Sequence, residues 1–135
     1  MMNLYPYFKI DALNSFILPF ILLFGVLCIV YSLKSLSDIK NKLSFYTLMV
    51  LTVISAVGCV LANNLIVLLV FWGFLGLTLY LLINISGTKE AAAAAKKTFI
   101  IIGASDVLMI FGIAIVYSLT GSLDIDKIKL SFNLA

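Results

Sequence analysis

Residues 43–88 read LSFYTLMVLTVISAVGCVLANNLIVLLVFWGFLGLTLYLLINISGT, and this stretch carries no formal charge. Roughly 20 apolar residues, each rising about 1.5 Å along a helix, cross a hydrocarbon core of about 30 Å. The stretch is therefore long enough for two membrane spans. Its one strong interruption, Asn63-Asn64, suits a tight turn. We predict spans at about 43–62 and 65–86, joined by this turn.

Two further apolar stretches flank this pair. Residues 12–33 contain no charge, and residues 98–120 contain one acid, Asp106. All four stretches are hydrophobic all round, as lipid-embedded helices are, whereas barrel strands would alternate over about ten residues. The sequence predicts an all-α fold: an integral membrane bundle of four transmembrane helices in a single domain, 1–135, with a short polar C-terminal tail at 121–135.

The composition argues against a water-soluble domain. Of the 135 residues, 64% are hydrophobic and 11% are charged, against roughly 45 to 50% and about 25% in ordinary soluble domains. So few charged side chains do not cover a soluble surface. The net charge of +3 is small and dispersed, which argues against a nucleic-acid partner. The expected partners are the lipid bilayer and other membrane subunits.

The lysines predict an orientation. Six lie in the first and third connections between spans, and three lie on the opposite side. By the positive-inside bias, the first and third connections face the cytoplasm. We therefore predict a multi-pass protein of the cell membrane with both termini outside. The six are Lys34, Lys40, Lys42, Lys89, Lys96 and Lys97, and the three are Lys9, Lys127 and Lys129.

The residue inventory argues against covalent chemistry. The sequence has no histidine, so it offers neither an imidazole base nor a Ser-His or Cys-His pair. Cys28 and Cys59 lie inside predicted spans, where we interpret them as small apolar packing residues. The sequence also lacks the glycine-rich motifs that bind nucleotides. We expect no catalytic residue, no metal site and no cofactor.

Asp106 stands out because it is an ionisable residue at depth, about 12 Å along the helix from Thr98. An acid in a span costs roughly 2.5 to 3.5 kcal/mol on insertion scales, so it usually has a partner or a water-filled cavity. Lys97, nine residues earlier, falls on the opposite side of the helix. The partner must come from another helix or subunit. Two readings stay open: a structural hydrogen-bonding group, or a station in a proton or cation path.

The segment 91–97, AAAAAKK, is strongly helix-forming. Thr88 and Glu90 before it supply an N-terminal cap and a first-turn charge. We interpret the segment as the interfacial start of the fourth helix. Lys96 and Lys97 either extend to the headgroups or titrate inside a channel, which keeps both as ion-path candidates.

Gly73, Gly76, Tyr80 and Asn84 fall within about one face of the third span. Small residues let another helix approach closely, and the Tyr and Asn side chains add hydrogen-bonding groups. We interpret these four residues as a helix-packing surface.

Three stretches resemble one family: FKIDALNSFILPF (8–20), LANNLIVLLVFWGFLGLTLYLLI (61–83) and AAAAAKKTFIIIGASDVLMIFGIAIVYSLTGSLDI (91–125). They are similar to the antiporter-like proton-translocating subunits. Such subunits occur in the membrane arm of NADH-quinone oxidoreductase, in membrane-bound energy-converting hydrogenases and in Mrp-type sodium/proton antiporters. The resemblance covers nearly the whole chain. Its motif positions include Asp11, Asn63, Asn64, Trp72 and Gly73.

The sequence also departs from the family pattern. Gly73 stands where the family carries an intramembrane glutamate, which is coupled to a lysine on a later, interrupted helix. That later helix would begin where this sequence ends, and the family's transport path is formed by two inverted bundles. The resemblance places Asp106 at the family's acid in the sixth helix and Lys97 at its preceding basic position. Ser105 replaces the glycine usually found before the acid.

Three hypotheses follow from these patterns. The first is a small antiporter-like membrane subunit of a redox-driven complex that translocates H⁺ or Na⁺, in which the chain is structural or accessory to the ion path. The second is a structural or relic membrane protein without transport. The third is a small independent cation transporter that forms an oligomer around Asp106.

Overall fold

The computed structural model describes residues 7–35 and 42–128. All four of its long helices are apolar enough to cross a membrane, which confirms the predicted all-α membrane fold. Lys40 and the tail from Lys129 to Ala135, which entered the sequence-based predictions, lie outside the described residues. The helices are α1 (Ala12–Ser35), α2 (Lys42–Leu61), α3 (Leu65–Ile83) and α4 (Lys89–Thr120), and two short 3-10 helices are η1 (Asn84–Ser86) and η2 (Ile125–Lys127).

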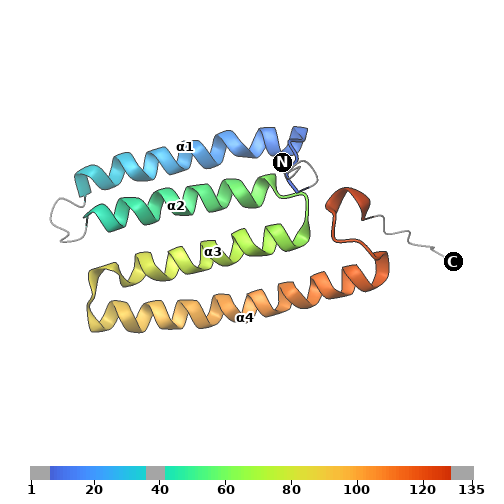
Figure 1. Cartoon of the computed structure of the whole chain (residues 1–135). Coiled ribbons are helices and arrows are strands. Elements are labelled where there is room, and N and C mark those ends of the chain that lie inside the picture. Colours follow the sequence, from blue (N-terminus) through green and yellow to red (C-terminus); the bar gives the residue numbers. More distant parts are fainter. Residues whose placement is uncertain (1–6, 36–41, 129–135) are drawn as a thin grey trace, which may run out of the picture.

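The four long helices lie side by side in chain order, and each packs against the next (Figure 1). The contact between α2 and α3 is the most extensive of the three. This single row leaves most large apolar side chains exposed, and in the described ranges the buried apolar residues are Ala62 and Ala95. Such faces need an apolar solvent, which a bilayer supplies.

Each of the three helix contacts brings a glycine against a side chain of the neighbouring helix. The absence of a Cβ atom lets the backbones approach closely at these points. The approach is tightest between α2 and α3, where only a glycine fits without a shift of its neighbour. A Cβ would lie 2.8 Å from Val53 at Gly25, 2.4 Å from the ring of Phe71 at Gly58, and 3.2 Å from Ile102 at Gly76.

Side-chain caps begin α3 and α4, as the sequence predicts for Thr88. The Thr88 hydroxyl accepts a hydrogen bond from the backbone amide of Ala91 at 3.1 Å. The Asn64 side chain accepts one from the amide of Ile66 at 2.9 Å. Each cap satisfies one of the amides that a helix start leaves without an intrahelical partner. Because the alanine run is helical, α4 begins well before the apolar span predicted within it.

At one end of the row, backbone hydrogen bonds join three segments that are far apart in sequence. We call these segments, 7–9, 61–65 and 122–127, the terminal clasp. The turn between α2 and α3 lies in its centre, with one segment bonded to each side. The clasp thus ties the start of α1 and the segment after α4 to the same turn. Its backbone bonds run from Lys9 N to Leu61 O (2.9 Å), Asn63 N to Tyr7 O (2.7 Å), Leu65 N to Leu123 O (2.9 Å) and Ile125 N to Asn63 O (2.8 Å).

Candidate functional site

Trp72 and Asp106 form a hydrogen bond between α3 and α4. The indole Nε1 of Trp72 donates to the carboxylate Oδ1 of Asp106 over 2.9 Å. Trp72 lies near the middle of α3, so the bond is far from both ends of that helix. The sequence predicts a partner for Asp106 on another helix or another subunit, and among the described residues Trp72 of α3 donates to it. Both residues stand out in the sequence, but their separation of 34 positions gives no sign that they pair.

The surroundings of this pair are open and apolar. Asp106 is half-buried, and Trp72 is 44% exposed. In the part of the chain that the structure describes, Trp72 is the one hydrogen-bonding partner of Asp106, and it occupies only one carboxylate oxygen. A shallow groove of about 180 Å³ begins at the Trp72 ring. Its walls are Trp72, Leu75, Gly76, Leu79 and Ile102.

Gly73 lies next to the pair but contacts neither helix neighbour. A Cβ atom at this position would meet nothing within 4 Å. The position at which the resembling family carries a glutamate is therefore unobstructed in this chain. Gly73 belongs to the packing surface predicted on the third span, but the structure leaves it exposed.

The other three residues predicted for that surface lie differently. Gly76 faces Ile102 of α4. The Tyr80 ring packs on that of Phe99, also of α4, with 5.3 Å between centroids. Asn84 ends α3, and its backbone amide donates to carbonyls of that helix. Gly76 and Tyr80 thus line the contact between α3 and α4, while Asn84 is a helix terminus.

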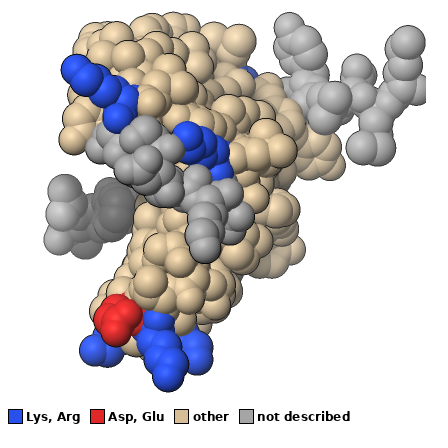
Figure 2. Space-filling view, turned by 90° about the vertical axis from the view of Figure 1, so that its left-hand side faces the viewer, with Lys and Arg blue, Asp and Glu red and all other residues tan. Residues whose placement is uncertain are grey.

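Lys96 and Lys97 are exposed near the start of α4 and do not meet Asp106. Nine residues of helix place Lys97 about 13 Å along the axis from Asp106. Neither lysine forms an ion pair with another described residue. Figure 2 shows the end of the molecule to which they belong, with lysine side chains in the upper part of the apolar row and at its lower end, where an acidic side chain lies beside them. The described lysines of this end are Lys34, Lys42, Lys89, Lys96 and Lys97.

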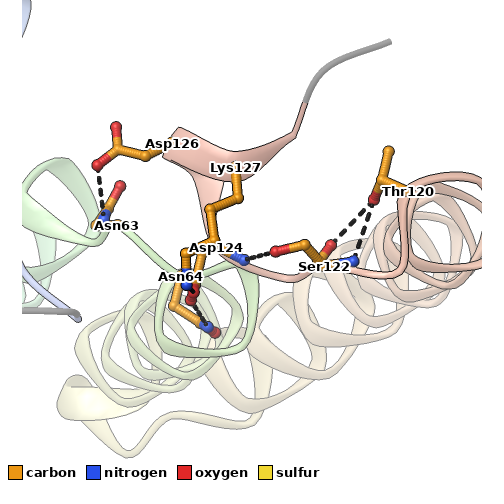
Figure 3. A network of polar contacts seen from close by, with 7 residues as sticks. All are labelled: Asn63, Asn64, Thr120, Ser122, Asp124, Asp126 and Lys127. Carbon is orange, nitrogen blue, oxygen red and sulfur yellow. Dashed lines mark hydrogen bonds and ion pairs between the residues drawn. The ribbon is translucent and has the colours of Figure 1, made fainter.

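The opposite end carries paired charges within the terminal clasp (Figure 3). The Asn64 side chain donates to Asp124 at 2.8 Å, and Asn63 donates to Asp126 at 3.1 Å. Lysines hold the same two carboxylates. The ion pairs join Lys9 to Asp126 (2.7 Å), Lys127 to Asp124 (2.8 Å) and Lys9 to Asp11 (3.3 Å).

These contacts shift the pKa values of the clasp groups. The hydrogen bond from Lys9 lowers the pKa of Asp126, and that from Lys127, with a smaller effect of Asn64, lowers the pKa of Asp124. The hydrogen bonds to Asp126 and then Asp11 raise the pKa of Lys9. Each charged form is favoured because its partner is of opposite charge or donates to it. Asn63, Asn64, Asp11 and the lysines Lys9 and Lys127 stand out in the sequence, but the role of Asp124 and Asp126 as their partners was not predicted. The sequence signal for these two acids is the Asp-x-Asp-Lys run after the fourth span.

The described side chains of the site can form hydrogen bonds, and their carboxylates can exchange protons. Asp106 is the one acid within the four helical spans described, apart from Glu90 at the first turn of α4. Across 7–35 and 42–128, no group of three His, Cys, Asp or Glu side chains lies together as a metal site would require. A carboxylate at such depth is the kind of group that proton relays use.

Comparison with known proteins gives consistent matches. The NADH:quinone oxidoreductase/Mrp antiporter transmembrane family matches residues 62–135, more than half of the chain. Relatives named NAD(P)H-quinone oxidoreductase subunit 5, chloroplastic, are 35% identical over 127 residues in Physcomitrium patens and 36% identical over 118 residues in Phaseolus vulgaris. These alignments cover 93% and 87% of this chain, but 18% and 16% of the relatives. No solved structure matches significantly.

The chain therefore spans less than a fifth of the length of these curated relatives. Both the family match and the relatives agree with the motifs quoted from 8–20, 61–83 and 91–125. The match to the family includes α3 and α4, and with them Trp72 and Asp106. On these grounds the chain is a multi-pass membrane protein that belongs to the NADH:quinone oxidoreductase/Mrp antiporter family.

Proposed function

We propose that this chain forms part of a membrane subunit of a redox-driven complex that translocates protons. The family match over residues 62–135 carries this proposal. It is supported by relatives whose names make them subunits of NAD(P)H-quinone oxidoreductases. In this role the chain supplies four helices of an antiporter-like bundle, and other membrane subunits or segments cover its exposed apolar faces.

Asp106 is the proposed proton-exchanging group of these four helices. It lies on α4, and its hydrogen bond to Trp72 leaves one carboxylate oxygen without a described partner. Gly73 offers no carboxylate at the family's glutamate position. The proposed main path therefore runs through groups outside this chain, and Asp106 lies beside it. Lys96 and Lys97 serve at the membrane surface and not in the path, because they are exposed and distant from Asp106.

The proposed orientation places the lysine-rich end on the cytoplasmic side of the cell membrane and the terminal clasp outside. Among the described lysines, five belong to the first end and two, Lys9 and Lys127, to the clasp. The two clasp lysines are paired with aspartates, so the clasp end also lacks an excess of positive charge. The positive-inside bias favours this direction.

Affinity purification tests the proposed function. The chain is tagged in the organism that produces it and purified in mild detergent, and the proteins that accompany it are identified. We expect subunits of an NAD(P)H-quinone oxidoreductase or a related redox complex. A Cys28→Ala variant is the matched control, because Cys28 is exposed on α1 and distant in sequence from the α3–α4 pair. A chain that purifies alone, without redox subunits, would contradict the proposal.

A second measurement separates this proposal from independent transport. The purified chain alone is reconstituted in liposomes with a pH gradient across the membrane. We expect the gradient to persist, because the family's glutamate is replaced by Gly73. A cation-dependent collapse that Asp106→Asn abolishes would favour the small oligomeric transporter instead.

A further inference from the structure

We infer that Trp72 is a positioning residue for Asp106: it fixes one carboxylate oxygen in the contact between α3 and α4 and leaves the other to exchange a proton. This inference deepens the proposed function, and the proton exchange that it assigns to Asp106 rests on that function. The hydrogen bond between Nε1 and Oδ1, at 2.9 Å, is its starting point. An indole N–H can only donate a hydrogen bond, so Oδ1 of Asp106 is the acceptor in this contact.

The packing of α3 against α4 holds the donor in place. On one side of Trp72 along the helices, Gly76 lets Ile102 approach to 3.2 Å of where its Cβ would lie. One turn further, the rings of Tyr80 and Phe99 pack together at 5.3 Å. These contacts fix the register of the two helices. The rigid indole ring therefore meets Asp106 at a defined depth.

A neutral donor suits a group that changes its protonation state. A lysine in this apolar place would hold the carboxylate in its charged form, because opposite charges attract strongly where the dielectric constant is low. The indole N–H can donate to a carboxylate oxygen and, more weakly, to the carbonyl oxygen of the neutral acid. The same bond therefore survives both states of Asp106, which keeps its position as a proton enters or leaves.

Few other titratable groups compete with Asp106 near the indole. Between Leu65 and Ile83, α3 has no charged residue, and its one titratable side chain is Tyr80. From Thr98 to its end, α4 adds only Tyr117 to Asp106. On α2, which packs on the other side of α3, Cys59 contacts the carbonyl of Leu68 at 3.9 Å. Of these groups, Asp106 is the one that is hydrogen-bonded to the Trp72 indole.

Trp72 is the only tryptophan of the chain, so its spectra report this one hydrogen bond. The full chain is placed in phosphatidylcholine vesicles, and the emission of Trp72 is measured from about pH 4 to about pH 8. A neutral carboxylic acid quenches indole emission more than a carboxylate does. We expect emission to fall in a single step as the pH decreases. In Asp106→Asn the step should be lost.

Ultraviolet resonance Raman spectra test the bond itself. The indole band that responds to N–H hydrogen bonding should show a bonded indole in the native chain. It should remain so in Asp106→Asn, whose amide oxygen still accepts, and change to the unbonded position in Asp106→Leu. The matched control is Trp72→Phe combined with Phe74→Trp, which moves the single indole two positions along α3 to an exposed site. Its emission should not follow the titration.

Three results would overturn the inference. One is an unbonded indole in the native chain, and another is an emission that does not change with pH although the bond is present. The third is an equal pH response in the native chain and in Asp106→Asn, since the response would then come from another group. None of these results depends on co-purification. A chain with the expected spectra that purifies without redox subunits would therefore refute the proposed function and leave the positioning role intact.

Discussion

At the scale of single residues, Asp106 lies within a membrane span, where an ionisable side chain costs free energy, and among the described residues it has one hydrogen-bonding partner, Trp72. An ionised acid within a span is expensive, and here one neutral donor offsets part of that cost. A purely structural carboxylate would be better satisfied by several donors, because buried polar groups are usually hydrogen-bonded wherever they can be. The second carboxylate oxygen, which has no hydrogen-bonding partner among the described residues, is the one to which we assign the proposed proton exchange.

Substitution of Asp106 separates the two readings in the assembled complex. Asp106→Asn retains the acceptor for Trp72 but does not exchange a proton. We expect normal assembly, with redox-driven proton pumping reduced about two- to tenfold, less than the roughly 100-fold typical of a central acid-base group. Pumping is measured by the quenching of a pH-sensitive dye in sealed vesicles. Asp106→Leu is the structural control, because it leaves the indole N–H unsatisfied at roughly 1 to 3 kcal/mol.

If Asp106→Asn pumps like the native complex while Asp106→Leu fails to assemble, the residue is a structural hydrogen-bonding group. The exchange role would then be wrong.

Two glycines allow a second comparison at the same scale. A Cβ atom at Gly58 would lie 2.4 Å from the Phe71 ring, whereas one at Gly73 would meet nothing within 4 Å. We expect Gly58→Ala to destabilise the helix bundle by about 1 to 3 kcal/mol through overpacking. Gly73→Ala should be neutral or stabilise by up to about 1 kcal/mol, because alanine favours the helix. Unfolding in mixed detergent and denaturant, followed by circular dichroism, measures both.

Equal effects of the two substitutions would contradict this prediction. They would mean that helix propensity, and not contact with Phe71, decides the outcome.

At the scale of elements, the terminal clasp joins segments that belong to different helices. The turn between α2 and α3 is bonded to the N-terminal segment on one side and to the segment after α4 on the other. Side chains of Asn63 and Asn64 reach the two aspartates that lysines also hold (Figure 3). The clasp therefore links the two outer helices of the row, α1 and α4, through a turn that touches both flanking segments.

The ion pairs of the clasp predict how its stability depends on pH. The pKa values of Asp124 and Asp126 are lowered in the folded chain, so their ionised forms stabilise the clasp. This stabilisation is complete above the ordinary pKa of Asp and is lost as the pH falls through the lowered pKa values. The pKa values of Lys9 and Lys127 are raised, so their charged forms also stabilise the clasp. This stabilisation is complete below the ordinary pKa of Lys and is lost as the pH rises through the raised pKa values. The clasp should be most stable between about pH 4 and about pH 10.

Hydrogen exchange checks this expectation at the amide of Ile125, which donates to Asn63 in the clasp. Its protection, corrected for the intrinsic pH dependence of exchange, should decrease below about pH 4. Lys9→Met should reduce protection already at neutral pH, because it removes the partner of Asp126. Lys97→Met, a lysine at the other end without a described ion pair, is the control. Unchanged protection in Lys9→Met would show that the backbone bonds suffice alone.

At the scale of the whole molecule, charge separates the two ends of the row. The clasp end pairs its described lysines with aspartates, whereas the lysines of the opposite end, shown in Figure 2, have no described carboxylate partners. Free lysines next to helix ends suit the cytoplasmic interface, where they also contact anionic headgroups. The lysine count already favours this orientation, and the ion pairs strengthen it, because aspartates neutralise the two described lysines of the clasp.

Cysteine labelling tests the orientation. In a Cys28→Ala, Cys59→Ala background, single cysteines replace Lys89 at the lysine-rich end or Ile125 at the clasp, both of which are exposed. A membrane-impermeant maleimide should label Ile125→Cys in intact cells and Lys89→Cys only after permeabilisation. The expected difference is nearly complete, since the bilayer blocks the reagent. The reverse pattern would invert the proposed topology.

The sequence alone determined the four long helices, their membrane character and the position of the one acid within the predicted spans. Each follows from local composition. About 20 apolar residues span a bilayer, and a single carboxylate among them can be recognised without knowing how the helix packs. Thr88 likewise predicts its cap, since the partner lies three residues away. The family motifs were readable for the same reason, because they are contiguous.

Only the tertiary structure decided which distant residues meet. Trp72 and Asp106 are 34 positions apart, and Lys9 and Asp126 are 117 apart. All-round hydrophobic helices give no periodic signal for the face that turns toward a neighbour, so the pairing of α3 with α4 at this register was not readable. Gly73 and Gly76 share a predicted face, yet only Gly76 contacts α4. Packing fixes such contacts because it depends on the shapes of both helices at once.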